Sequence, residues 1–249
     1  MLDWALNQAA GLQALGLEAV PRLVSVASHG DQRLELPLLW ALCRNWIDQG
    51  HTVLVLDGHS TESADNPGLL QKLQQGGLGP DEDGLDGSWK IMPAASGLAA
   101  LDTPNFIAID TPQRQLASLF AHFGVVVVYA PASVLAALLR GTEAQPLVVV
   151  PPLHEGVLTA YRALKQLRLD GQLQATVTQI VLPELGTPSM TQTAPMEQLK
   201  ACARNFLGLE LKPIRLRAGT TAPEALTTLA LQLLENAVLL QRHSKRSVH

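Results

Sequence analysis

Histidine and carboxylate side chains follow several of the hydrophobic runs of this chain. Side chains of this kind could act as general acids and bases in a hydrolytic reaction or could hold a divalent metal ion. No HxH or HExxH spacing ties the histidines together, so we expect them to face solvent and predict no metal site. The residues concerned are His29, Asp31, Asp57, His59, His154 and Glu155.

The elements that would position these side chains follow a βαβ pattern. Residues 23–27 and 52–56 are short hydrophobic runs typical of strands. Between them, residues 38–47 have the composition of a buried helix that ends at Gly50. This order favours an α/β fold with a parallel sheet, whose carboxyl edge collects the residues that follow each strand.

The same stretch resembles the MinD/ParA family of deviant P-loop ATPases. Residues 25–28 (SVAS) match the family's first strand, Ala41-Leu42 with Gln49-Gly50 match its first helix, and residues 53–57 (VLVLD) match its second strand, with no gap. The resemblance implies a single α/β domain with a mostly parallel central sheet flanked by helices, the P-loop NTPase fold in its MinD-like form.

The resemblance also shows which phosphate-binding residues are missing. A phosphate loop needs glycines, a lysine for the phosphates and a hydroxyl for Mg²⁺. Here Gly30 stands at the signature lysine, Glu35 at the second lysine and Leu36 at the threonine, while Asp31 replaces a glycine. Negative charge therefore faces a site that needs positive charge.

Two further nucleotide motifs depart from the family. His59 stands where the second aspartate of the DxD motif would position water, and Tyr129 replaces the aspartate of the Mg²⁺-associated DTPAG motif. The segment at Asp110 looks more like the DTPAG motif letter for letter. It is less favoured, because choosing it would leave one more hydrophobic strand than the fold accounts for. We expect a pseudo-ATPase that is not an enzyme, binds neither ATP nor Mg²⁺ and forms no ATP-dependent dimer.

Three other segments are similar to the flagellar regulator family FlhG, also called FleN. They are residues 90–101 (KIMPAASGLAAL), the strand and helix within residues 146–165, and a late strand entry at residues 205–211 (NFLGLEL). This similarity implies a regulatory protein-binding factor for flagellar number or placement. Two alternatives remain: a weak ATPase with a remodelled site at His29, Asp57 and Asp110, or a pseudo-ATPase of another cell-envelope system, like the BcsQ and CpaE proteins.

The N-terminal segment, residues 1–16, resembles the activator helix with which FlhG proteins stimulate the GTPase FlhF. Asn7, Gln8, Ala9 and Leu12 stand in its DQAxxLR motif, and asparagine in place of aspartate departs from it. The resemblance implies an FlhF-type GTPase or a flagellar basal-body protein as partner. The alternative is a terminal helix that packs on the domain through Trp4, Leu12 and Leu15.

Composition agrees with one domain, residues 20–241. The chain has 249 residues, 47% of them hydrophobic, and a net charge of −4, which offers no nucleic-acid footprint. Its two cysteines show no metal or disulfide spacing, and we see no signal peptide, so we expect a cytoplasmic protein.

The C-terminal segment presents a hydrophobic helical face ahead of a basic tail, residues 242–249. Such a face suits a membrane surface with anionic headgroups, which would place the protein at the periphery of the inner membrane. The favoured alternative is that the helix docks on the sheet. The candidate membrane-contact residues are Leu226, Leu229, Leu233 and Leu240.

Overall fold

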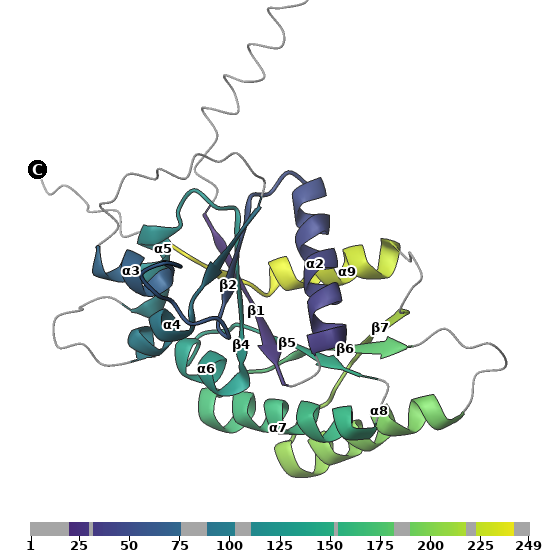
Figure 1. Cartoon of the computed structure of the whole chain (residues 1–249). Helices are drawn as coiled ribbons and strands as arrows, with labels where there is room; N and C mark the ends of the chain where they lie inside the picture. Colours follow the sequence, from purple (N-terminus) through teal and green to yellow (C-terminus); the bar gives the residue numbers. More distant parts are fainter. Residues whose placement is uncertain are drawn as a thin grey trace, which may run out of the picture.

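The computed structural model describes residues 20–29, 32–75, 89–102, 111–151, 154–181, 190–217 and 223–241. Within them a single sheet runs through the molecule with helices on both faces (Figure 1). Its strands are β1 (Arg22–Ser28), β2 (Val53–Asp57), β3 (Trp89–Pro93), β4 (Val125–Pro131), β5 (Leu147–Val150), β6 (Thr176–Val181), β7 (Ile214–Arg217) and β8 (Val238–Leu239).

The strand order is β3-β2-β4-β1-β5-β6-β7, and every neighbouring pair in it is parallel. Only β8, among the described strands, runs antiparallel, beside the start of β1. The carboxyl ends of β1, β2 and β4 therefore lie together at one edge of the sheet, where α/β proteins bind ligands.

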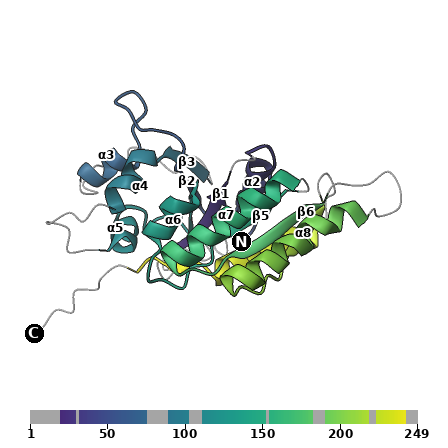
Figure 2. The ribbon, with the colours of Figure 1, turned by 90° about the horizontal axis from the view of Figure 1, so that it is seen from below.

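Two helices cover one face of the sheet, α2 (Gln32–Asp48) and α9 (Pro223–Glu235). The opposite face carries the remaining helices (Figures 1 and 2). These are α3 (Leu69–Gln74), α4 (Ala95–Asp102), α5 (Pro112–Leu119), α6 (Ala132–Leu138), α7 (His154–Gly171) and α8 (Met190–Cys202), which continues as the π-helix η1 (Ala203–Leu207).

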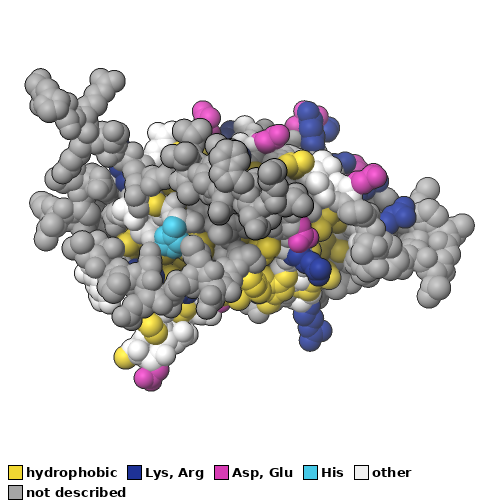
Figure 3. Space-filling view, turned by 90° about the horizontal axis from the view of Figure 1, so that it is seen from above, with side chains coloured by type: hydrophobic (Ala, Val, Ile, Leu, Met, Phe, Trp, Pro, Cys, Tyr) yellow, Lys and Arg dark blue, Asp and Glu magenta, His cyan; other side chains and the backbone are white. Residues whose placement is uncertain are grey.

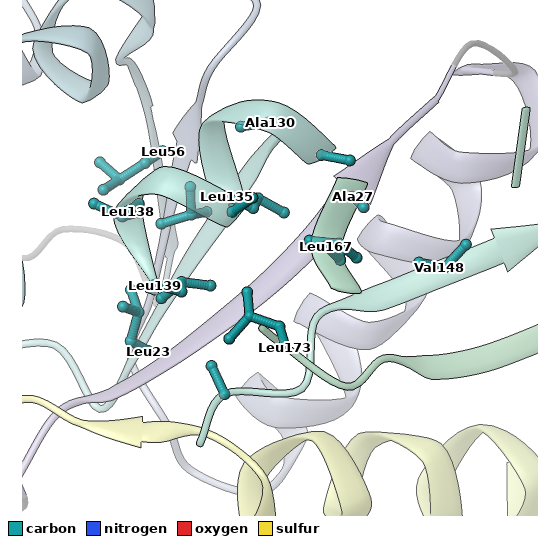
Figure 4. Packing of buried hydrophobic residues seen from close by; sticks show 14 of the residues in the cluster. Leu23, Ala27, Leu56, Ala130, Leu135, Leu138, Leu139, Val148, Leu167 and Leu173 are labelled. Carbon is teal, nitrogen blue, oxygen red and sulfur yellow. The ribbon is translucent and has the colours of Figure 1, made fainter. Parts of the chain in front are cut away.

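The core explains why β4 is a continuous hydrophobic run. Val126 and Val128 point into the cluster under α6 and α7, whereas Val125 and Val127 point into the cluster under α2 and α9. A parallel sheet covered on both faces needs apolar side chains at every position. Figure 4 shows the first of these clusters, where Leu135 and Leu139 lie beside Leu23 and Leu56.

The βαβ unit predicted from the sequence is confirmed, since β1, α2 and β2 follow the expected order and are parallel to their neighbours. Gly50, which ends the helix, has φ +88°, a left-handed conformation that glycine adopts without strain. Residues 205–211, expected as the entry to a late strand, lie ahead of β7 and contain no strand residue themselves. Residues 203–207 form the π-helix, and the strand follows at β7.

The predicted membrane-contact face is also corrected. Leu229 and Leu233 are buried against the sheet and α2, and Leu226 is partly buried in the same cluster. Leu240 lies beyond α9, which ends at Glu235, and is buried in the opposite cluster. These leucines stabilise the domain, so they are not free to enter a bilayer. Among the described helices, none combines the length and the hydropathy needed to cross a membrane.

Candidate functional site

The site lies at the carboxyl edge formed by β1, β4 and β2. Tyr129 on β4 is in register with Val26 on β1 and with Asp57 on β2, so the ends of all three strands are level. Helix α2 begins at Gln32, four residues after β1 ends at Ser28, so its first turn lies near this edge. β4, which carries Tyr129, lies between β1 and β2, whereas Asp110 lies outside the described residues.

A buried carboxylate occupies the first turn of α2. The side chain of Glu35 is completely buried, and its two oxygens have different partners. The Tyr129 hydroxyl donates to Oε2 at 2.8 Å, and the backbone N–H of His29 donates to Oε1 at 3.2 Å. The Glu35 carboxylate thereby joins the end of β1, the first turn of α2 and the end of β4.

The His29 imidazole lies between α2, β5 and α7. Its Nε2 is 2.5 Å from the Val149 carbonyl oxygen and 3.7 Å from Oε1 of Glu35, and its Nδ1 is 3.0 Å from Oγ1 of Thr159. The Thr159 hydroxyl donates to the carbonyl of Gly156, so it accepts from the ring. A carbonyl oxygen only accepts. Both ring nitrogens of His29 therefore have partners within the fold.

The Tyr129 hydroxyl is strongly biased toward its neutral form. Burial is the main cause that raises its pKa, and the hydrogen bond and negative charge of Glu35 add to it, with a smaller contribution from Asp57. A side-chain hydrogen bond with Ser28 acts in the opposite direction. A phenol that stays protonated can keep donating to the carboxylate, which is the arrangement that the structure has.

The loop after β2 is held by the Asp57 carboxylate. Oδ1 accepts from the backbone N–H of His59 at 3.0 Å, and Oδ2 accepts from Oγ of Ser60 at 2.5 Å. His59 itself is exposed, and its ring lies 5.2 Å from the Tyr129 ring. The backbone N–H of Gly58 donates to the Tyr129 carbonyl at 2.8 Å. Both Asp57 oxygens are therefore used within the loop.

Glu62 is a structural residue that the sequence did not reveal. Its carboxylate accepts from the backbone N–H groups of Ser96 at 2.7 Å and Gly97 at 2.8 Å, at the start of α4, and from Leu70 at 3.2 Å, at the start of α3. Burial raises the pKa of Glu62, but these backbone hydrogen bonds outweigh it and the pKa lies below its usual value. A carboxylate suits two helix N-termini, which carry unpaired donors and partial positive charge.

Some predicted site residues lie outside the described ranges. These are Asn7, Gln8, Ala9, Leu12, Gly30, Asp31 and Asp110. His154 and Glu155 begin α7, but their side chains are not described. Glu35, Asp57, His59 and Tyr129 are brought together at the same edge, whereas Leu36 is a partly buried residue of the α2 cluster. In the described part of the chain no three His, Cys, Asp or Glu side chains are placed to hold a metal ion.

Two described side chains differ in chemistry from those that the MinD/ParA resemblance places around a Mg²⁺-bound triphosphate. At the position of the phosphate-binding lysine, Glu35 supplies a buried negative charge, and at the position of the Mg²⁺-binding hydroxyl, Leu36 packs into the core. Like charges in a poorly solvated site repel strongly. The Glu35 carboxylate already takes up donors near the helix start, including the His29 N–H. The polar side chains described at this edge therefore form hydrogen bonds with other groups of the protein.

Charge on the opposite edge is mixed. Figure 3 shows that face, where the Lys and Arg side chains visible among the described residues lie near Asp and Glu side chains. With a net charge of −4, the chain lacks the charge balance typical of proteins that bind nucleic acid through its phosphates.

Comparison with known proteins identifies the fold. No family model and no curated protein sequence matches the chain. Among solved structures, MinD in the MinC:MinD cell division protein complex of Aquifex aeolicus is 14% identical, with a TM-score of 0.53, over 89% of this chain and 99% of that one. A putative plasmid partition protein from Borrelia burgdorferi B31, bound to AMPPNP, is 9% identical with a TM-score of 0.54, over 86% and 97%. A ParA family ATPase from Chlorobium tepidum is 13% identical with a TM-score of 0.50, over 87% and 92%. The chain therefore has the single-domain α/β fold of the MinD/ParA P-loop ATPases.

Proposed function

We propose that this protein is a regulatory binding protein built on the MinD/ParA fold, and that it neither binds nor hydrolyses ATP. Its activity would then consist of protein contacts rather than turnover. A fold does not by itself specify a function, so the proposal depends on the residues at the site.

The observation that carries the proposal is the hydrogen-bonded position of Glu35. Its carboxylate is buried, accepts from Tyr129 Oη at 2.8 Å and lies 3.7 Å from Nε2 of His29. A bound phosphate would have to share this region with an anion that has no route to solvent. Removing the carboxylate from its partners would in turn leave the hydroxyl and the N–H unsatisfied, at a cost of about 1–3 kcal/mol for each buried group.

A weak ATPase with a remodelled site is the less favoured candidate. It would need Asp57 or His29 to orient water or to hold a metal ion. Both Asp57 oxygens accept hydrogen bonds from the following loop, and both His29 ring nitrogens have partners. In the structure these atoms are held by contacts within the protein rather than arranged around a substrate or metal ion.

The finer assignment depends on sequence resemblance. The segment at residues 90–101, which forms β3 and α4, is similar to a characteristic segment of FlhG, and residues 1–16 resemble its activator helix. We therefore propose a cytoplasmic role in flagellar number or placement, with an FlhF-type GTPase or a basal-body protein as partner. A role like that of BcsQ or CpaE in another cell-envelope system is the alternative.

Titration calorimetry of the full chain with Mg-ATP tests the loss of nucleotide binding. We expect no binding heat at millimolar ligand and no phosphate release. A micromolar dissociation constant would contradict the proposal.

A second assay tests the partner, using an FlhF-type GTPase with the full chain and with Gln8→Ala. We expect the full chain to stimulate GTP hydrolysis and the variant to lose stimulation more than affinity, because an amide that orients water acts mainly in the transition state. Failure to bind or stimulate would remove the flagellar assignment but would leave the result on ATP unaffected.

A further inference from the structure

A polar cavity lies at the amino edge of the sheet, at the opposite ends of the strands from Glu35. Its volume is about 690 Å³, within the range of ~300–1,000 Å³ that is usual for ligand pockets. Three segments line it: residues 142–145 before β5, residues 172–174 before β6, and residues 235–239, which end α9 and form β8. All of these residues belong to the described part of the chain. We call this cavity the amino-edge cavity.

Amide and carboxylate side chains supply the polar surface of the amino-edge cavity, and none of its lining residues is Lys, Arg or His. Nδ2 of Asn236 donates to Oε1 of Gln145 at 3.0 Å, which joins the end of α9 to the loop before β5. This bond leaves Oδ1 of Asn236 as an acceptor. Glu143 and Glu235 are exposed, and neither carboxylate has an ion-pair partner in the described structure. The cavity therefore presents acceptors that no cation of its own lining neutralises.

Two helices end beside the cavity and add to its negative potential. Helix α7 ends at Gly171 and helix α9 ends at Glu235, directly before two of the lining segments. The last carbonyl groups of a helix lack partners within the helix and carry partial negative charge. The chain itself shows what this end of α9 accepts, because Nη1 of Arg22 donates to the Leu234 carbonyl at 2.8 Å.

The charged groups around the cavity do not cancel this potential. Arg140 and Asp170 are exposed, have opposite signs and stand shortly before the first two lining segments. Arg22 pairs with Leu239 across β1 and β8, but its guanidinium is already bonded to α9. The lining itself contributes only the two carboxylates, Glu143 and Glu235. A cationic ligand therefore fits this cavity better than an anionic or neutral one.

We propose that the amino-edge cavity binds an arginine side chain of a partner protein. A guanidinium has five donors in a planar fork and is more weakly hydrated than an ammonium, so it can bond to carboxylates and to an amide oxygen together. Its aliphatic stem would lie on the apolar lining, where Leu239 is 49% exposed. Among the described residues no group of His, Cys, Asp and Glu side chains is arranged for a metal ion, which favours an organic cation.

This inference goes beyond the proposed function, because it concerns the other edge of the sheet and uses none of residues 1–16. It adds a second surface for protein contacts. Binding of ATP at the carboxyl edge, or failure to stimulate an FlhF-type GTPase, would leave it unaffected.

The first test titrates N-acetyl-arginine-N-methylamide into the ¹⁵N-labelled full chain. The readout is the side-chain amide signals of Gln145 and Asn236, which line the cavity. The matched control is the citrulline derivative, which has nearly the same shape but no charge. We expect saturable shifts with the arginine probe and about tenfold weaker binding of the citrulline probe, because charge-assisted hydrogen bonds are lost. Added salt should weaken the arginine probe more than the citrulline probe.

The second test removes the carboxylates one at a time. Glu143→Gln and Glu235→Gln keep the size of each side chain, and both residues are exposed, so the fold should tolerate them. We expect each change to weaken binding of the arginine probe by about threefold, as for ion pairs near solvent. Glu224→Gln is the matched control. It removes the same charge from the first turn of α9, where the carboxylate is exposed and does not line the cavity, and it should leave the affinity unchanged.

Four outcomes would overturn the inference. Absence of a saturable shift at Gln145 and Asn236 would show that the cavity does not take the probe. Equal affinities for the arginine and citrulline probes would show that it does not recognise the charge. An equal loss in Glu224→Gln would assign the effect to net charge rather than to the cavity. Tighter binding of spermidine or of free arginine than of the arginine probe would assign the cavity to a free cation instead of a partner's side chain.

Discussion

The Tyr129 hydroxyl donates a 2.8 Å hydrogen bond to the Glu35 carboxylate, from the end of a central strand to the first turn of the helix that follows β1. Both side chains are buried, and both stand at positions where the resemblance to MinD/ParA proteins places nucleotide-binding residues. Two residues that differ from the nucleotide-binding motifs of that family are thus hydrogen-bonded to each other. This coupling explains why they fit the fold together.

Tyr129→Phe should destabilise the protein. The change keeps the ring but removes the donor, so the buried carboxylate loses one of its partners, and we expect the free energy of unfolding to fall by about 1–3 kcal/mol. Urea denaturation followed by circular dichroism measures this. Tyr161→Phe on α7 is the matched control, because Tyr161 is only partly buried and lies outside the site. Equal losses in both variants would contradict a specific Tyr129 to Glu35 bond.

Alkaline titration should show one tyrosine that ionises late. The pKa of Tyr129 is raised in the folded state, chiefly by burial and then by Glu35. Its contribution to stability is complete below the ordinary tyrosine pKa of about 10 and is lost as the pH rises through the folded value. Absorbance of tyrosinate near 295 nm should therefore show a delayed step that is absent in Tyr129→Phe. A delayed step that survives in that variant would assign it to another residue.

Glu62→Ala should loosen the segment after β2. It removes one acceptor shared by the first turns of α3 and α4, and loss of a cap at two helices should cost about 1–4 kcal/mol. Because the pKa of Glu62 is lowered in the folded state, its contribution is present above the ordinary value of 4.5 and is lost as the pH falls. Unfolding measured between pH 7 and pH 3 should show this loss in the parent protein but not in Glu62→Ala.

Glu210→Gln is the control for that measurement, because Glu210 is exposed. If it gave the same change in pH dependence as Glu62→Ala, the effect would reflect overall charge rather than the two helix starts.

The sequence was sufficient for the central regular elements. Period and composition define β1, α2, β2 and β4, because strands covered on both faces are continuous hydrophobic runs. The contacts among the replaced residues could not be predicted in the same way. In the sequence, Glu35 is only a negative charge at a position where the family has a lysine. The fold shows that the Tyr129 hydroxyl and the His29 N–H lie within hydrogen-bonding distance of it.

Long-range partners account for the other failures. After β2, Glu62 accepts hydrogen bonds from residues 34 and 35 positions away in the chain, contacts that no local pattern contains. At the C-terminus, an amphipathic pattern fits both a membrane surface and a core, and the burial of Leu229 and Leu233 follows from contacts with α2 that no local pattern contains.

Restoring the phosphate loop alone should not restore an ATPase. The graft Gly30→Lys, Asp31→Gly, Gln32→Gly, Leu34→Gly, Glu35→Lys and Leu36→Thr supplies the residues that a phosphate cradle needs. It also removes the acceptor of the Tyr129 hydroxyl and leaves His59 and Tyr129 where the family has aspartates. We expect no phosphate release and no change in light scattering with Mg-ATP, because neither water nor Mg²⁺ would be held. The matched variant adds His59→Asp and Tyr129→Asp to the same graft, and any ATP-dependent dimer or turnover should appear there first. Turnover in the loop graft alone would show that Tyr129 and His59 are compatible with catalysis, and that the loop by itself accounts for the loss.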